Sequence, residues 1–121
     1  MPRLTRSQLG KRAQRKGKRY EAQIARRYRM IYGDSVRRST AGRQSYGASD
    51  APDVIGCGVF AVECKHQKSI NVRRAMQQAC EAAKPGQVPV CHLKWQGGYE
   101  VVVVLVHDWF DLINESNERT K

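Results

Sequence analysis

Two carboxylates and a lysine stand within one mostly apolar stretch of the chain, residues 52–65, PDVIGCGVFAVECK. Asp53 begins this stretch, and Glu63 and Lys65 close it. Two carboxylates held close together repel each other and favour a divalent cation between them, and oxygen ligands suit Mg²⁺ or Mn²⁺. Such a cation stabilises charge on a phosphoryl group, and a neighbouring lysine orients the attacking water or neutralises the transition state. A surface ion pair of Lys65 with either acid is the alternative interpretation.

Two strands must position these side chains, DVIGC and GVFAVECK, joined by a tight turn at residues 56–58. Side chains alternate along a strand, so Glu63 and Lys65 share one face. A hairpin folded at this turn brings Asp53 beside Glu63 or Lys65 across the ladder. We therefore expect the two carboxylates and the ammonium to meet at one edge of a sheet.

The remaining elements follow from hydrophobic periodicity and turn residues. Residues 18–32 and 70–84 predict helices, residues 36–39 a short strand, and residues 40–51 a loop. VPVCHLKW and YEVVVVLV predict two further strands before a last amphipathic helix, HDWFDLINES. The order α-β-β-β-α-β-β-α predicts one α/β domain over residues 18–116, a mixed sheet flanked by helices, followed by a polar tail at 117–121.

Charge is distributed unevenly along the 121 residues, whose formal net charge is +11. Fourteen of the 22 Lys and Arg fall within residues 1–43, where Glu21 and Asp34 are the only acids. This asymmetry predicts that a polyanion, most often nucleic acid, binds the N-terminal part. We expect residues 1–17 to form a flexible basic arm; a merely solvated tail is the alternative. The expected phosphate contacts are Arg3, Arg6, Lys11, Arg12, Arg15, Lys16, Arg37, Arg38 and Arg43.

Composition argues against a membrane or secreted protein. The sequence has no run of 18 apolar residues and no apolar segment near its start, which favours a cytoplasmic protein. The basic stretch lacks the Trp, Phe and broad apolar face of a membrane-surface helix. The four cysteines form no C-x-x-C pair and lie in apolar contexts, so we expect buried free thiols.

PD followed by ECK resembles the signature of the PD-(D/E)xK nucleases, and the order of elements over residues 17–106 is similar to the core of that superfamily. Within it, the chain most resembles the Holliday-junction resolvases of archaeal and phage type, which carry a loop like RRSTAGRQSYGASDAPDV before the PD strand. The resemblance implies a restriction-endonuclease-like fold. It also implies that Asp53, Glu63 and the backbone carbonyl of Cys64 bind Mg²⁺, with Mn²⁺ as a substitute, and that Lys65 acts on the nucleophilic water.

The resemblance gives a catalytic role to Glu21 as well, because these nucleases carry an acid on the first helix that points into the site. Helical spacing places Glu21 on the buried side of its helix, where an acid needs a partner, and an ion pair with a neighbouring arginine is the alternative. Ser39 and either Gln77 or Gln78 match supporting positions of the family. Asp50 is a rival to Asp53 as a metal ligand.

The expected function is that of a metal-dependent, structure-selective DNA endonuclease of bacterial, archaeal or phage origin. It would hydrolyse phosphodiester bonds at four-way junctions during DNA recombination and repair, as a homodimer, because a junction presents two symmetric strands. YEVVVVLV and the helix with Trp109 and Phe110 offer an apolar interface, unless these aromatics cap the core. The alternatives are a flap, repair or restriction-like nuclease of the same superfamily, or a non-catalytic basic nucleic-acid-binding protein.

Overall fold

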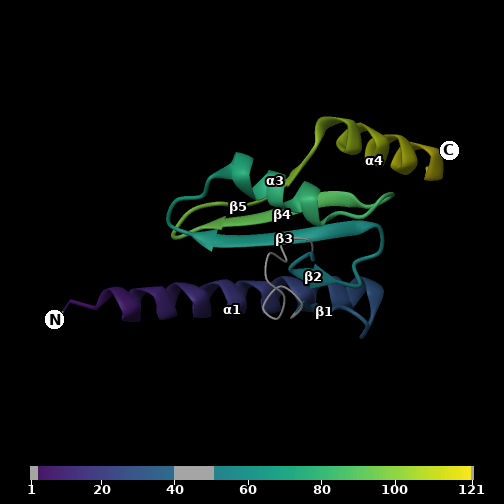
Figure 1. Ribbon diagram of the computed structural model, residues 1–121. Helices are drawn as coiled ribbons and strands as arrows, with labels where there is room; N and C mark the ends of the chain where they lie inside the picture. The colour runs from purple at the N-terminus through teal and green to yellow at the C-terminus, as the bar shows by residue number, and fades with distance from the viewer. Residues whose placement is uncertain (1–2, 40–50, 121) are drawn as a thin grey trace.

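The computed structural model describes residues 3–39 and 51–120 and shows an α/β fold (Figure 1). The element order predicted from the sequence is confirmed. The predicted loop over residues 40–51, with Arg43 and Asp50, lies almost wholly outside the described residues. The elements are α1 (Arg6–Tyr32), β1 (Arg37–Arg38), β2 (Val54–Ile55), β3 (Phe60–Gln67), α3 (Val72–Ala82), β4 (Val88–Trp95), β5 (Glu100–Val104) and α4 (Val106–Arg119).

The strands form one mixed sheet in the order β1-β2-β3-β4-β5. β3 and β4 run parallel, and every other neighbouring pair is antiparallel. Parallel neighbours need a crossover connection, and α3 supplies it between β3 and β4. β3, which carries Glu63 and Lys65, is the third of the five strands, so these residues lie on the central strand and not on an edge strand of the sheet.

Helices cover the two faces of the sheet, with α1 on one side and α3 on the other (Figure 1). On the α1 side, Tyr20 and Ile24 pack with Val62 and Cys64 of β3. On the α3 side, the core consists of Ala75, Ala79, Cys91 and Leu93. Because helices lie on both faces of β3, the strand is buried on both sides, and a charged residue within it is removed from water.

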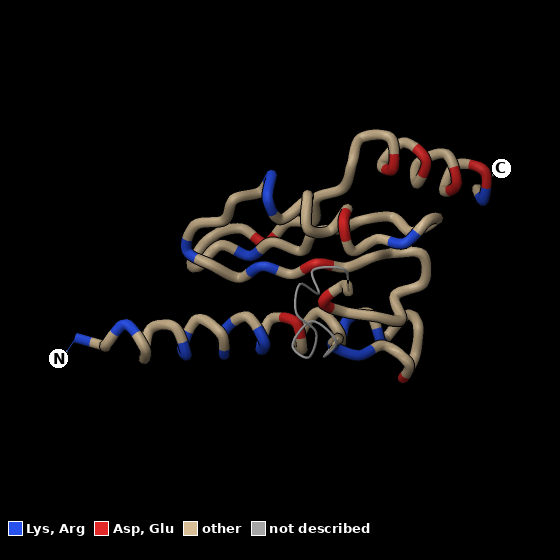
Figure 2. The backbone as a smooth tube through the Cα atoms, viewed as in Figure 1, with Lys and Arg blue, Asp and Glu red and all other residues tan. Residues whose placement is uncertain are grey.

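The first half of α1 differs from the expected flexible arm, since residues 6–17 are helical. A capping box starts the helix: Gln8 N–H donates to Thr5 Oγ1 at 3.1 Å, and Thr5 N–H donates to Gln8 Oε1 at 2.8 Å. These two bonds satisfy free donors of the first turn and stabilise the helix start against the glycines that follow. Every residue from Arg3 to Arg15 is exposed, and Figure 2 shows Lys and Arg recurring along α1.

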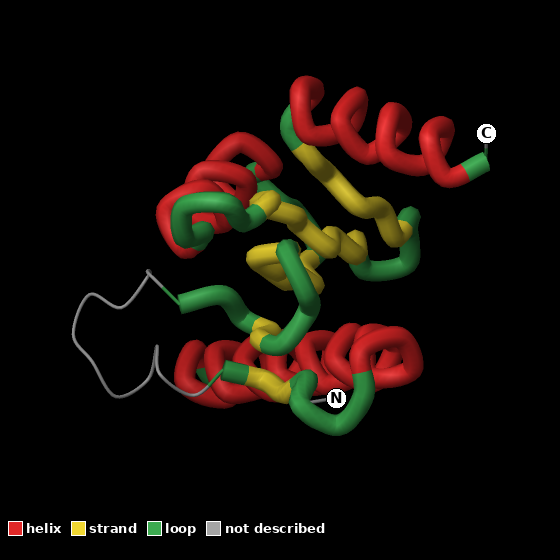
Figure 3. The backbone as a smooth tube through the Cα atoms, turned by 90° about the vertical axis from the view of Figure 1, so that its right-hand side faces the viewer, coloured by secondary structure: helices red, strands yellow, loops and turns green. Residues whose placement is uncertain are grey.

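The C-terminal helix α4 stands apart from the sheet and lies far from α1 (Figure 3). None of its residues is buried, and Trp109 and Phe110 are 53% and 58% exposed. These aromatics therefore do not cap the core, which was one of the two expectations for them. The helix runs to Arg119, so the predicted polar tail at 117–121 begins inside it.

Cys57, Cys64 and Cys91 are buried free thiols as expected, whereas Cys80 is exposed on α3. Burial raises the pKa of Cys57 to about 11 and that of Cys91 to about 12, so both stay protonated. No helix among the described residues has both the length and the apolar character needed to cross a membrane.

Candidate active site

The turn between β2 and β3 depends on a glycine that no other residue can replace without strain. Gly56 adopts φ 85°, and a Cβ there would lie 2.8 Å from the carbonyl oxygen of Ser35. The chain therefore reverses tightly and pairs Val54 with Val62 in an antiparallel ladder. Continuing that register by one residue sets Asp53 opposite Glu63, as the predicted hairpin requires.

Two hydrogen bonds hold Asp53 against β3. Its backbone N–H donates to the carbonyl oxygen of Val62 at 2.8 Å, and its Oδ2 accepts from the backbone N–H of Cys64 at 2.9 Å. The Asp53 carboxyl group also lies close enough to Glu63 for its charge to raise the pKa of that acid. Asp53 is thus held to β3 through both its backbone and its side chain, and the two acids form a pair.

Burial changes the acidity of this pair. Desolvation, followed by the charge of Asp53, raises the pKa of Glu63 to about 8, and desolvation also raises the pKa of Asp53. Two carboxylates side by side repel each other, which favours the protonated form of one of them. With its pKa at about 8, Glu63 is mostly protonated at neutral pH, and a bound cation would displace that proton.

Lys65 completes the predicted cluster. Its Nζ lies 4.0 Å from Glu63 Oε2, on the same face of β3, and its charge opposes the rise in the pKa of both acids. Only 9% of the Glu63 side chain is exposed. The alternative interpretation as a surface ion pair therefore does not describe this contact for Glu63.

Glu21, Asp53 and Lys65 line one groove of about 430 Å³ between α1 and the end of β3, here called the active-site groove. Glu21 is half-buried and its Oε1 lies 3.9 Å from Arg38 Nη2, so both the position in the groove and the ion pair with an arginine are realised. Ser39 N–H donates to the carbonyl oxygen of Asp53 at 2.8 Å, which joins β1 to the acid pair through the backbone.

The structure separates the two glutamines of α3. Gln77 is exposed and donates to Glu81 at 3.2 Å, whereas Gln78 is half-buried and lines a hollow together with Lys65. Gln78 Oε1 is buried and has no hydrogen-bond partner among the described residues. Of the two candidates, Gln78 is the one on the side of the site.

The cations expected to contact phosphate fall into three groups. Lys16 lines the active-site groove and donates to Gln96 Oε1 at 3.1 Å. Arg37 is exposed on β1, Arg38 is half-buried beside Glu21, and Arg43 lies outside the described residues. The others lie in the exposed first half of α1 or just before it, and they are Arg3, Arg6, Lys11, Arg12 and Arg15.

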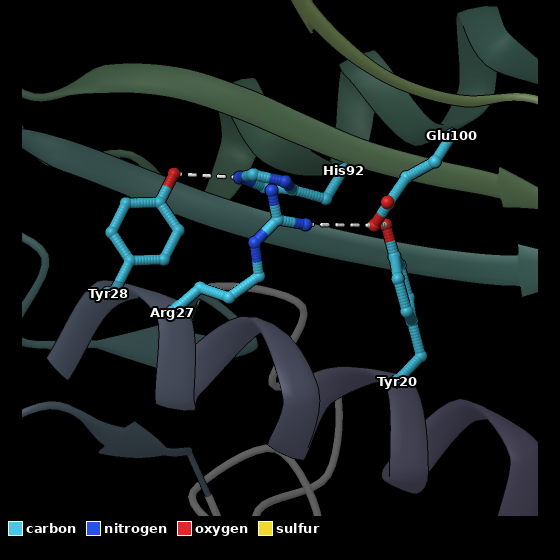
Figure 4. A network of polar contacts seen from close by, with 5 residues as sticks. All are labelled: Tyr20, Arg27, Tyr28, His92 and Glu100. Atoms are coloured by element: carbon cyan, nitrogen blue, oxygen red, sulfur yellow. Dashed lines mark hydrogen bonds and ion pairs between the residues drawn. The ribbon is translucent and has the colours of Figure 1, made fainter. Parts of the chain in front are cut away.

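A polar network that sequence reasoning missed ties α1 to β4 and β5 (Figure 4). Tyr20 donates to Glu100 Oε2 at 2.9 Å, and Arg27 Nη1 lies 3.3 Å from the same oxygen. The Tyr28 hydroxyl lies 2.7 Å from His92 Nε2, with the two rings edge to face. Tyr20 and Tyr28 are two turns apart on α1, but their polar partners come from strands remote in sequence. The network fixes α1, and with it Glu21, against the sheet.

The donor set suits a hard divalent cation in chemistry, since Asp53, Glu63 and the carbonyl of Cys64 all offer oxygen. The described residues hold no cluster of three His, Cys, Asp or Glu side chains with metal-binding geometry. A cation here would therefore keep several waters, as Mg²⁺ does. No protein-family model, curated protein or solved structure matches this chain.

Proposed function

We propose that this protein is a Mg²⁺-dependent DNA endonuclease whose reaction centre is Asp53, Glu63 and Lys65. The observation that carries the proposal is a pair of acids with raised pKa values, the buried Glu63 and the half-buried Asp53, with Glu63 Oε2 4.0 Å from the Lys65 ammonium. Removing acids from water costs stability, and groups held at such a cost are characteristic of functional sites. Their resemblance to the PD-(D/E)xK signature supports the same chemistry.

Asp53, Glu63 and the Cys64 carbonyl would hold the cation, which would polarise a phosphodiester and lower the pKa of a bound water. Lys65 stands beside the pair, where its charge stabilises the negative charge that develops on the phosphoryl oxygens. Glu21 lies in the same groove and orients Arg38, whose Nε and Nη2 have no hydrogen-bond partner among the described residues. In this proposal these residues position a phosphate.

DNA is the substrate that the charge favours. The exposed first half of α1 leads directly to the active-site groove, where Lys16, Lys65 and Lys68 accompany the acids. Phosphate contacts of this kind position a duplex without reading its bases. Recognition by shape follows, and within the resembling superfamily a four-way junction is the structure we propose.

A homodimer would supply the two reaction centres that a junction requires. The apolar stripe of α4, namely Val106, Trp109, Phe110 and Ile113, is exposed and repeats at helical spacing. A second copy of the chain is the partner we propose for it. Figure 2 shows that the acids of α4 lie away from the basic first half of α1, so this end of the protein is poorly suited to DNA.

The deciding experiment incubates the protein with a four-way junction, a flap and a linear duplex, with and without Mg²⁺. We expect Mg²⁺-dependent cuts in opposing strands of the junction, lost in Glu63→Gln and retained in Glu81→Gln, which changes an exposed acid. Preference for flaps would keep the nuclease and reject the resolvase. Binding without any cut, under all metals, would favour the non-catalytic binding protein.

A further inference from the structure

Three hollows on the protein share lining residues. The active-site groove and a second hollow of about 240 Å³ are both lined by Lys65 and Gln67. A third hollow, of about 510 Å³, shares Asn71, Arg74 and Gln78 with the second. Each hollow therefore lies beside the next, in a series from α1, past the end of β3, to α3, which we call the depression. We name the second one the middle hollow.

Charge along this depression suits an extended polyanion. Acids line its two ends, Glu21 and Asp53 in the groove and Glu81 in the third hollow. The residues that line the middle hollow include two cations and no acid. The lining cations are Lys16, Lys65 and Lys68 in the groove, Lys65 and Arg74 in the middle hollow, and Arg73 and Arg74 in the third hollow.

The polar groups of the middle hollow are available to a ligand. Arg74 makes no ion pair among the described residues, and its backbone is fixed because its N–H donates to Asn71 Oδ1 at 3.0 Å. Gln78 lines the same hollow, and its Nε2–H groups are the donors that a phosphate oxygen, which only accepts, could use.

We propose that the middle hollow binds a phosphate of the cleaved strand adjacent to the scissile one, through Arg74 and the Gln78 amide. This inference rests on the proposed function, which places the scissile phosphate at Asp53 and Glu63. Lys65 borders both spaces, so a strand that leaves the reaction centre past Lys65 enters the middle hollow. Arg74 and Gln78 are positioning residues: they hold the strand in register while the acids act.

Binding without a metal tests the hollow independently of cleavage. Arg74→Ala should weaken junction binding in EDTA about 10-fold and reduce the log–log salt slope by about 0.7–0.9. The matched control is Arg119→Ala, which removes the same charge from α4, a helix that lines none of the three hollows, and should leave both values unchanged. Equal losses in the two variants would overturn the proposal, because they would report only net charge.

Cleavage of junctions that carry one neutral methylphosphonate tests the position of the contact. Scanning that group along the cleaved strand should slow the wild-type protein at a phosphate beside the cut. Arg74→Ala and Gln78→Ala should lose this sensitivity, while Gln77→Ala should keep it. A wild-type protein that cuts nothing rejects the proposed function, and the EDTA measurement still decides the hollow. If wild type and Arg74→Ala both cut the junction and respond identically to the methylphosphonate scan, the phosphate site in the middle hollow is rejected and the proposed function stands.

Discussion

Asp53 Oδ2 accepts a hydrogen bond of 2.9 Å from the backbone N–H of Cys64, and this bond holds the carboxylate against β3, the strand that carries Glu63. The neighbouring strand thereby holds one acid against the other, at the cost of a raised pKa for both. Both of these raised pKa values belong to acids of the proposed reaction centre. The hydrogen bond therefore connects the folding of the β2–β3 hairpin directly to the chemistry proposed for that centre.

Replacing either acid should abolish cleavage and leave DNA binding intact or tighter. Asp53→Asn and Glu63→Gln each remove a ligand of the proposed cation and a negative charge near phosphate. The measurement is single-turnover cleavage of a junction beside its equilibrium binding. Ca²⁺ should support binding without turnover, because its looser coordination positions the water poorly. Near-wild-type cutting by either variant would remove the pair from the site.

The same Glu63→Gln change should stabilise the apo protein above about pH 8. The pKa of Glu63 is raised in the folded state, so the unfolded state releases its proton first and stability falls as pH rises from about 4.5 to 8. Removing the ionisable group removes that loss, a gain of more than ~1 kcal/mol in the free energy of unfolding. Urea unfolding at several pH values measures it, with Glu81→Gln as the control.

Mg²⁺ binding should make the wild-type protein more stable than Glu63→Gln, which is the reverse of the order expected for the two apo proteins. Mg²⁺ added at neutral pH should raise the melting temperature of the wild-type protein, because a ligand that binds the folded state alone stabilises it. Glu63→Gln should respond much less. A melting temperature that Mg²⁺ leaves unchanged in both proteins, up to millimolar concentration, would contradict the proposed cation site.

Truncation of the first half of α1 separates a binding element from a solubilising one. Deleting residues 1–16 should lower DNA affinity and flatten its salt dependence, by about 0.9 in the log–log slope for each lost phosphate contact. The fold should survive, since Arg3 to Arg15 are all exposed. Far-UV circular dichroism checks the fold, and an unchanged salt slope would identify the segment as a solvated extension.

His92 should make stability fall on the acid side. Burial, followed by the charge of Arg27, lowers its pKa from 6.5 to about 4. The unfolded state therefore takes up a proton first, and the contribution present above about pH 6.5 is lost as pH falls toward 4. The acid pair changes stability in the opposite direction as pH falls. The measurement is therefore the difference in the free energy of unfolding between wild type and His92→Gln. That difference should change with pH only over this interval; a constant difference would contradict the assignment.

How far the sequence predicts this site depends on the range of the interactions involved. The hairpin and its acid pair follow from local rules, namely the turn glycines and the alternation of side chains along β3. The choice between Gln77 and Gln78 does not, because it depends on how α3 rotates against the sheet, where Ala75, Ala79 and Ala82 are buried.

Three other features escaped prediction for different reasons. The T-x-x-Q capping box at Thr5 is a local signal for the start of α1, but Gly10 and Gly17 obscure it. Arg74 becomes a candidate only once the hollows are seen to connect, since its position in the sequence is that of an ordinary exposed helix cation. The separation of α4 from the core is likewise invisible to its amphipathic pattern, which fits both a core helix and an interface.

A single residue, Leu105, joins β5 to α4. Because so short a connection allows little independent movement, the end of the edge strand β5 sets the tilt and rotation of the helix. One added residue at the joint would swing the apolar stripe by about 100° around the helix axis. The length of this joint thus determines in which direction the apolar stripe points. It thereby also determines at what angle any molecule bound to the stripe meets the sheet.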